Sequence, residues 1–265
     1  MNFGTQGFPQ GLGLSSGLFG FSLPSYIFRQ PWTPANITTQ LWLDAADSST
    51  ITLDGGAVSQ WGDKSGNGRN ATQTTAANRP VVLSANINGL NVLSFDNSND
   101  AMTTNWNSTA TNNYMIFSVA NLNTGSGFRR MIASTTYNNH ITPINGGNPN
   151  QAIQIKSSDV SAQWATGGTS NLSVLVAPTT GNFLHFSNGS ERTINSVAVT
   201  DWGVLTLGRL AVFAEPMDGR FCELIVIYSS NITIRQLTEG YLAHKWGLTA
   251  NLPIDHPYKT NPPTS

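Results

Sequence analysis

The stretch MDGRFCELIVIYSSNITIRQLTEGYLAHKWGL, residues 217–248, carries the two patterns that decide the fold. Its first part, RFCELIVIY, is a nearly continuous apolar run of strand length, which predicts a strand buried between two sheets. Its second part predicts a helix. Thr233 and Gln236 match a capping box at the start, and Gly247 is a suitable residue for the end. The sequence therefore places one buried strand and one short helix near the C-terminus.

Eight further segments have the length and composition of strands. One of them, NFLHFSNG, ends in Asn188–Gly189, a strong signal for a hairpin turn. Many short strands separated by turn signals, without helices between them, predict a β-sandwich. No repeat of fixed period occurs, which argues against a propeller or a solenoid. The other seven segments are LWLDAA, NVLSFD, YMIFSVAN, RMIAST, QAIQIK, LSVLVAP and VLTLGRLA.

The composition is that of an exposed, loop-rich β-protein. Charged residues make up 10% of the chain, whereas Asn, Ser and Thr together make up roughly a third of it, more than is usual. The formal net charge is −1, so nothing indicates binding to nucleic acid or to anionic membranes. A single cysteine, Cys222, excludes an internal disulfide framework, and its apolar surroundings predict a small core residue.

Export signals are missing from this surface-type sequence. No segment is long and apolar enough to predict a membrane span, and the N-terminus lacks the basic region of a signal peptide. A virion protein reconciles these observations, because it folds in the host cytoplasm without disulfides and leaves when the cell lyses.

Residues 1–34 differ from the rest of the chain. Glycine recurs here beside phenylalanine or leucine, and this density of glycine disfavours regular helix. A solvated linker normally lacks aromatic residues. Two interpretations remain: a flexible tail, or an extended arm that buries apolar anchors on a neighbouring subunit. We favour the arm, with anchors at Phe3, Phe8, Leu12, Leu14, Leu18, Phe19, Phe21, Tyr26 and Phe28.

Three segments resemble a known family. The first, LWLDAADSSTITLDGGAVSQWGDKSGNGRNATQ (41–73), ends in a Trp-x-Asp-x-Ser-Gly-Asn-Gly turn, and the second is the stretch 217–248, in which Gly219 and Glu223 lead into the apolar strand. With LPIDHPYK (252–259), they are similar to the concanavalin A-like, laminin-G-type jelly-roll domains of phage and bacterial surface proteins.

This resemblance implies an all-β antiparallel jelly-roll sandwich with an extended N-terminal arm and one short C-terminal helix. We expect the arm at residues 1–34, the sandwich at 35–259 and a tail at 260–265. The arm has no counterpart in the family's domain, and it favours an anchored virion component over a free lectin.

Catalytic patterns are lacking. A glycosidase on this fold needs two carboxylates facing the scissile bond. None of the four glutamates begins the Glu-x-Asp motif of the glucanases, and no Gly-x-Ser-x-Gly elbow occurs. Histidines His140, His185, His244 and His256 are expected to pack or to face solvent. We therefore predict that the chain is not an enzyme.

Two binding chemistries are compatible with the loops. Asp63, Ser65 and Asn67 alternate oxygen-bearing side chains in a Gly-rich turn, which is compatible with calcium. The alternative is a turn whose side chains bond to their own backbone, and we favour it. The Asn-rich loops that contain Trp106, Asn107 and Trp164 offer the aromatic and neutral polar groups that glycan binding needs.

The leading functional prediction is a non-enzymatic phage virion structural protein, either a capsid decoration or a tail or fibre component. Its expected partners are other virion proteins, bound through residues 1–34, and further copies of itself. The alternative is a carbohydrate-binding adhesin that recognises host-surface glycans. A glycoside hydrolase is disfavoured, no nucleic-acid or membrane partner is expected, and calcium is the one candidate cofactor.

Overall fold

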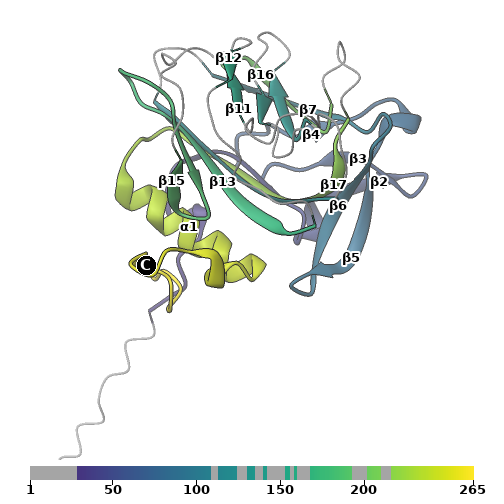
Figure 1. Cartoon of the computed structure of the whole chain (residues 1–265). Coiled ribbons are helices and arrows are strands. Elements are labelled where there is room, and N and C mark those ends of the chain that lie inside the picture. Colours follow the sequence, from purple (N-terminus) through teal and green to yellow (C-terminus); the bar gives the residue numbers. More distant parts are fainter. Residues whose placement is uncertain are drawn as a thin grey trace, which may run out of the picture.

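Three layers form the part of the chain that the structure describes (Figure 1): an outer sheet, a central sheet, and a layer made by helix α1 and the C-terminal segment. The predicted antiparallel β-sandwich with one helix is thereby confirmed. The computed structural model describes residues 29–108, 113–123, 130–134, 140–141, 153–155, 158–159, 168–192, 202–209 and 216–265. The predicted arm anchors, Phe3 to Phe28, lie outside these residues.

The central sheet has the order β15-β14-β13-β8-β17-β6-β5, and β1 also pairs with β17. The long strand β17 is therefore bonded to β8 along one edge and to β6 and then β1 along the other. The strands are β1 (Thr39–Asp44), β5 (Val81–Ile87), β6 (Leu90–Asp96), β8 (Tyr114–Leu122), β13 (Ser170–Ala177), β14 (Leu184–Ser187), β15 (Ser190–Arg192) and β17 (Asp218–Ile227).

The outer sheet has the order β12-β11-β10-β9-β16-β7-β4-β3-β2. All nine strands predicted from the sequence coincide with strands of one sheet or the other. The outer sheet consists of β2 (Ile51–Asp54), β3 (Ala57–Trp61), β4 (Ala71–Thr72), β7 (Met102–Asn107), β9 (Ile132–Ser134), β10 (His140–Ile141), β11 (Ile153–Ile155), β12 (Ser158–Asp159) and β16 (Val204–Leu207).

Two apolar cores cover the two faces of the central sheet. One lies between the sheets and includes Leu224 of β17 and Trp61 of the outer sheet. The other lies between the central sheet and the helix layer and includes Ile225 of β17 and Trp246. The apolar run of β17 is thus buried between the outer sheet and the helix layer, and not between two sheets as predicted. Cys222 is fully buried in the helix-side core, as expected.

The hairpin predicted at Asn188–Gly189 joins β14 to β15. Both residues have positive φ angles, 49° and 79°, as a type I′ turn requires, and Asn and Gly tolerate that conformation best. Local turn chemistry therefore fixes the register of this edge of the central sheet.

Helix α1 spans Ile232–Trp246, and its N-cap is Asn231. The Asn231 Oδ1 atom accepts hydrogen bonds from the backbone N–H groups of Thr233 and Ile234, at 2.8 and 3.2 Å. The prediction of Thr233 as the cap was wrong, because Asn231, two residues earlier, satisfies the free donors. Gly247 ends the helix at φ 72°, the left-handed conformation expected of a terminal glycine.

The segment after the helix folds back along it. Lys259 donates to the carbonyl groups of Ala250 and Leu252, at 2.7 Å each. A short 3₁₀ turn lies in this segment at Thr249–Asn251, and similar turns occur at Pro34–Asn36, Ser48–Thr50 and Ala76–Asn78. Gly240 lets this segment approach, since a Cβ atom at that position would lie 2.5 Å from the Cβ of Tyr258. The segment LPIDHPYK (252–259) is therefore part of the helix layer.

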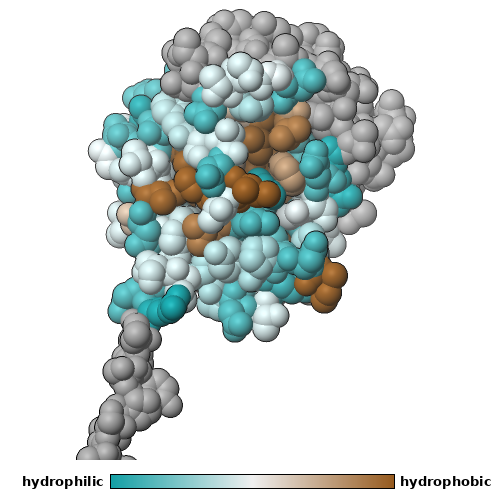
Figure 2. All heavy atoms as spheres, turned by 90° about the vertical axis from the view of Figure 1, so that its left-hand side faces the viewer, coloured by the Kyte–Doolittle hydropathy of each residue, from teal (hydrophilic) through white to brown (hydrophobic). Residues whose placement is uncertain are grey.

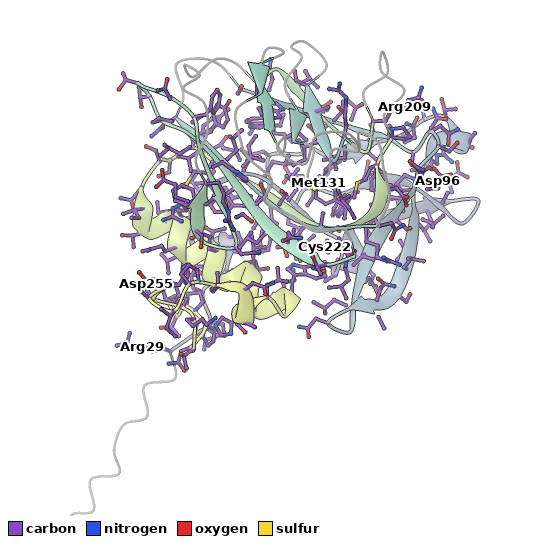
Figure 3. The ribbon with its side chains drawn as sticks, in the orientation of Figure 1. Arg29, Asp96, Met131, Arg209, Cys222 and Asp255 are labelled. Atoms are coloured by element: carbon purple, nitrogen blue, oxygen red, sulfur yellow. The ribbon has the colours of Figure 1, made fainter. Side chains whose placement is uncertain are left out.

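The two ends of the described chain meet beside this layer. Pro31 pairs with Thr264, and the N–H groups of Trp32 and Ser265 donate to Pro263 and Gln30, at 2.9 Å each. In Figure 3, Arg29 accordingly lies near the C-terminal segment that carries Asp255. The boundary predicted at residue 34 thus falls inside the folded unit, and the predicted tail 260–265 pairs with it. We call residues 1–28 the N-terminal segment below.

Apolar side chains gather on the face seen in Figure 2. This face includes the helix layer and the β13–β15 edge of the central sheet. Leu184 of β14 is 38% exposed and Ile232, at the start of α1, is 61% exposed. We call these two residues the helix-side patch.

Replacement of Asn231 by alanine should lower the free energy of unfolding by about 1 kcal/mol, because two helix N–H groups lose their acceptor. Thr233→Ala, at the position that the sequence pattern favoured, should cost less than half as much. Urea denaturation followed by tryptophan fluorescence measures both, and a larger effect at Thr233 would contradict the assigned cap.

Candidate functional site

A buried carboxylate, that of Glu223, lies at the contact between β17, β1 and α1. Its side chain is fully buried, and its oxygens accept hydrogen bonds from the indole N–H groups of Trp42 and Trp246, at 2.7 Å each. The hydroxyl of Tyr241 donates to it as well, at 3.1 Å. The register of β17 against β8 shifts between Phe221 and Glu223. This bulge directs Glu223 toward the helix.

A lysine completes this cluster. The Lys245 Nζ atom lies 2.7 Å from Glu223 Oε2 and 2.6 Å from Asp44 Oδ1. Asp44 also pairs with Lys64, at 2.9 Å, so two cations and two carboxylates alternate beneath the helix. Burial raises the pKa of Glu223, and the Lys245 ammonium opposes that rise. The network joins α1 to the strand pair β1–β17.

A second buried ion pair lies in the first half of α1. Arg235 donates to both carboxylate oxygens of Glu239, at 2.7 Å each, and its guanidinium lies 3.8 Å from the ring centroid of Phe186 on β14. The His256 Nε2 atom of the C-terminal segment lies 3.3 Å from Glu239. This pair therefore fixes the helix to the edge of the central sheet and to the chain end.

These contacts engage both buried glutamates in structural bonds. Glu223 and Glu239 are both 0% exposed, and their oxygens are held by the donors described above. Glu215 lies outside the described residues. His185 is buried beside Ser173, at 3.1 Å, and burial lowers its pKa to about 3. It is a packing residue, as predicted.

The turn predicted as a calcium candidate is held by its own hydrogen bonds. Both oxygens of Asp63 accept: one from the N–H groups of Trp42 and Ser65, at 2.9 Å each, and the other from the Ser65 hydroxyl and the Arg69 N–H, at 2.8 and 3.0 Å. Asn67 donates to the carbonyl of Thr39, at 3.0 Å. A cation would have to displace these donors, so the geometry supports the favoured alternative of a self-bonded turn that docks on β1.

No cluster of three or more His, Cys, Asp or Glu side chains suited to a metal ion occurs among the described residues. In the same part of the chain, no helix has the length and apolar character of a membrane span. Calcium binding stays a prediction.

The three residues predicted to bind glycans differ in their surroundings. Trp106 is fully buried in the core between the sheets, with its ring 5.8 Å from that of Tyr114 in an edge-on contact. A ring in this position has no face for a sugar, and the proposed role of Trp106 is corrected to core packing. Asn107 is exposed at the end of β7. Trp164 lies outside the described residues.

An acidic loop connects β6 to β7. Asp100 is 5% exposed, and its Oδ2 atom accepts a hydrogen bond from the N–H of Asp96, at 3.0 Å. Burial, together with the charge of Asp96, raises the pKa of Asp100 from 3.8 to about 6. The sequence patterns did not single out this carboxyl, because its burial depends on the packing of the loop.

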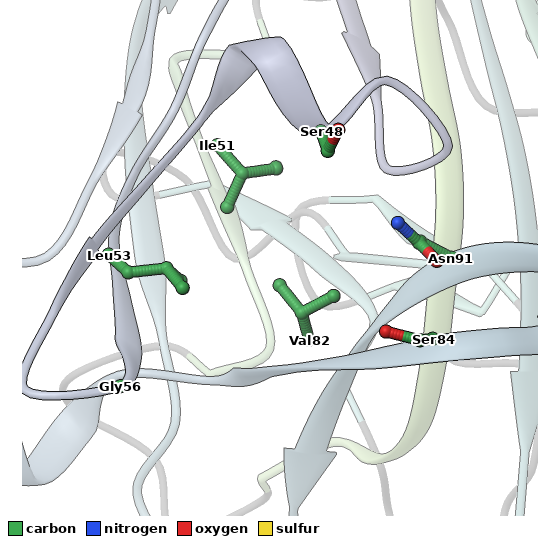
Figure 4. A pocket seen from close by; sticks show the side chains of 7 residues that line it. All are labelled: Ser48, Ile51, Leu53, Gly56, Val82, Ser84 and Asn91. Carbon is green, nitrogen blue, oxygen red and sulfur yellow. The ribbon is translucent and has the colours of Figure 1, made fainter.

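A pocket opens between the free edges of the two sheets. Its volume is about 350 Å³, within the range of small-ligand sites. Figure 4 shows Ile51 and Leu53 of β2 and Val82 of β5 directed into it. Its polar wall carries neutral groups, and none of the described residues that line it is aromatic or charged. The remaining lining residues are Ser48, Gly56, Ser84 and Asn91. We call this space the edge pocket.

The sequence matches no family model and no curated protein. The fold resembles the binding domain of Paraclostridial Mosquitocidal Protein 1, with a TM-score of 0.52 at 9% identity over 70% of this chain and 49% of that one. It also resembles the botulinum neurotoxin serotype D binding domain, with a TM-score of 0.53 at 14% identity over 77% of this chain and 51% of that one.

The receptor binding domain of a botulinum neurotoxin C/D mosaic serotype gives a TM-score of 0.52 at 15% identity, over 77% of this chain and 52% of that one. The chain thus spans about half the length of these three structures. At such identities the likeness concerns the fold, and the fold alone does not define a function.

Replacement of Lys245 by methionine should lower the free energy of unfolding by about 3–5 kcal/mol, because Asp44 and Glu223 would stay buried without their shared cation. Lys64→Met removes a more exposed partner of Asp44 and should cost about 1 kcal/mol. Urea denaturation at pH 7 compares the two variants, and equal losses would show that Lys245 has no special role.

Asp100→Asn should stabilise the protein by about 1–3 kcal/mol at pH 7.5, where the native state must carry an ionised, buried Asp100. The carboxyl binds its proton more tightly in the folded chain. The stability of the parent protein should therefore fall as the pH rises from 4 to 7, and the advantage of the variant should vanish near pH 4. Thermal melts across this range test the prediction, with the exposed Asp255→Asn as control. A pH-independent difference would contradict it.

Proposed function

We propose that this chain is a non-enzymatic structural protein of a phage particle, a capsid decoration or a tail or fibre component. In this proposal it folds in the host cytoplasm and is displayed on the virion surface. The N-terminal segment binds other virion proteins or further copies of the chain, and the sandwich points outward. The observation that carries the proposal is the fixed root from which the N-terminal segment leaves the sandwich.

The root is built into the fold. Trp32 is 5% exposed, and its ring packs edge-on against Tyr241 of α1, at 6.2 Å between centroids. The β-bridge between Pro31 and Thr264, with the backbone hydrogen bonds beside it, also holds this part of the chain. The root belongs to the helix layer, and the central sheet separates it from the outer sheet (Figure 1). A tether at this point leaves the outer sheet and its loops free for display.

The composition of the N-terminal segment supports attachment. It contains no charged residue and twelve large apolar side chains, Met1 and Tyr26 included, each of which contributes about 1.5–3 kcal/mol when it is fully buried. Catalysis is disfavoured because Glu223 and Glu239 serve as structural anchors of the helix. The proposal of a virion location further rests on the family resemblance of the sequence and on the absence of a disulfide framework.

A receptor-binding adhesin is the second candidate. The observation that favours it is the shared fold with domains described as receptor binding. Because Trp106 is buried and cannot stack on a sugar, an adhesin that binds glycans is less well supported. Binding of the protein to a glycan array, reduced by Asn107→Ala, would support it.

Deletion of residues 1–28 should yield a folded monomer, while the full chain assembles. The cut precedes Arg29, so that the deletion retains Trp32 and the pairing of the chain ends. Light scattering gives the masses, and thermal melts should show equal melting temperatures within about 2 °C, because the core is untouched.

A full-length variant tests whether assembly depends on the apolar side chains of the N-terminal segment or only on its presence. In this variant the nine predicted anchors of the N-terminal segment, together with Leu23 and Ile27, are changed to serine, and it too should be monomeric. If the unaltered full chain is itself a monomer, the attachment role is contradicted.

A further inference from the structure

The edge pocket has the properties of a docking site for an apolar chain segment. Leu53 is 53% exposed, and it differs from other exposed apolar side chains in lining a pocket together with Ile51 and Val82. Ile51, Leu53 and Val82 form the apolar part of the pocket, and Ser48, Ser84 and Asn91 supply neutral hydrogen-bonding groups around it (Figure 4). The pocket therefore suits an uncharged ligand with bulky apolar side chains.

Free strand edges flank the pocket on both sides. In the described part of the chain, strand β2 ends the outer sheet and β5 ends the central sheet, so each carries backbone N–H and C=O groups that no further described strand pairs. Register shifts interrupt β2 between Thr52 and Leu53 and β5 between Leu83 and Ile87. Such bulges disfavour the addition of a long regular strand. A guest would bind mainly by inserting side chains, with a few backbone bonds.

We propose that the edge pocket receives the N-terminal segment, residues 1–28, of a neighbouring copy of the chain. The two surfaces match in charge, because this segment contains no charged residue and the described residues that line the pocket are all uncharged. Phenylalanine and leucine side chains of the segment fit the aliphatic wall, and its glycines permit the close backbone approach that a strand edge requires. This inference rests on the proposed attachment role and names the partner of the segment.

The reach of the segment is sufficient. An extended stretch of residues 1–28 spans up to about 90 Å, whereas a compact domain of this size has a radius of gyration of about 18 Å. A segment rooted on the helix layer of one copy therefore reaches the sheet edges of the next. Repeated head-to-tail exchange of this kind builds a closed ring or a chain of subunits.

Substitutions on the two walls of the pocket test the proposal in the full chain. Leu53→Asp on β2 and Ser84→Arg on β5 each place a charge in the path of an apolar segment. Both positions are exposed, so the fold should persist, and a thermal melt verifies this. Each variant should dissociate the assembly to monomers in light scattering.

Matched controls carry the same kind of change elsewhere. Ile254→Asp alters the most exposed large apolar residue, 91% exposed and remote in sequence from the pocket, and should leave the assembly intact. Ile232→Asp alters the helix-side patch and should also have no effect. Dissociation by Ile232→Asp alone would identify the helix-side patch as the docking surface and overturn the proposal.

A binding assay measures the contact directly. A fluorescent peptide of residues 1–28 with a solubilising lysine tail should bind the protein that lacks these residues. Leu53→Asp should weaken this binding about tenfold or more, because a buried leucine is replaced by a charge, while Ile254→Asp should not change it.

The outcomes distinguish the two proposals. If the full chain and its deletion are both monomers, the attachment role itself fails. If the full chain assembles but the Leu53 and Ser84 variants assemble equally well, the attachment role stands and the edge pocket is overturned. If the full chain is a monomer in which residues 1–28 occupy their own pocket, the peptide will bind only the deletion, and exchange between copies is overturned.

Discussion

The enclosed carboxylate of Glu223 requires four donors at the same time, and the arrangement of the helix layer follows from that requirement. A buried carboxylate without partners costs several kcal/mol, so Trp42, Trp246, Tyr241 and Lys245 must all be in place. Trp42 belongs to β1 and the other three to α1. One side chain of β17 thus sets the position of the helix, and the helix in turn supports Trp32 and the root of the N-terminal segment.

Local patterns predicted most of the fold. Apolar runs of strand length marked nine strands, Asn188–Gly189 marked a hairpin, and Gly247 marked the end of the helix. The burial of Trp106 was also readable, because Met102, Thr104 and Trp106 are buried in alternation with exposed neighbours along β7. The Asn-rich composition of that stretch favoured the prediction of a loop, whereas the period of two in the same residues indicates a strand.

Other features depend on contacts that no local pattern contains. The partners of Glu223 include Trp42, which is 181 residues away in sequence. The domain boundary was placed too late because Pro31 pairs with Thr264 at the other end of the chain. The edge pocket likewise joins β2 and β5, which end different sheets. Sequence periodicity reports which face of an element is buried, and not which distant element covers it.

The place of β17 in the chain has a consequence for biosynthesis. This strand bonds to β1, β6 and β8, yet it is among the last parts to leave the ribosome. At 5–20 residues per second, about 10–40 s separate the emergence of the N-terminal segment from that of β17. During this interval an apolar, uncharged stretch precedes a sandwich that cannot close. Its frequent glycines and its prolines lower the tendency to form β-aggregates, so the residues that permit a close docking contact in our proposal also oppose aggregation of the nascent chain before the central strand is synthesised.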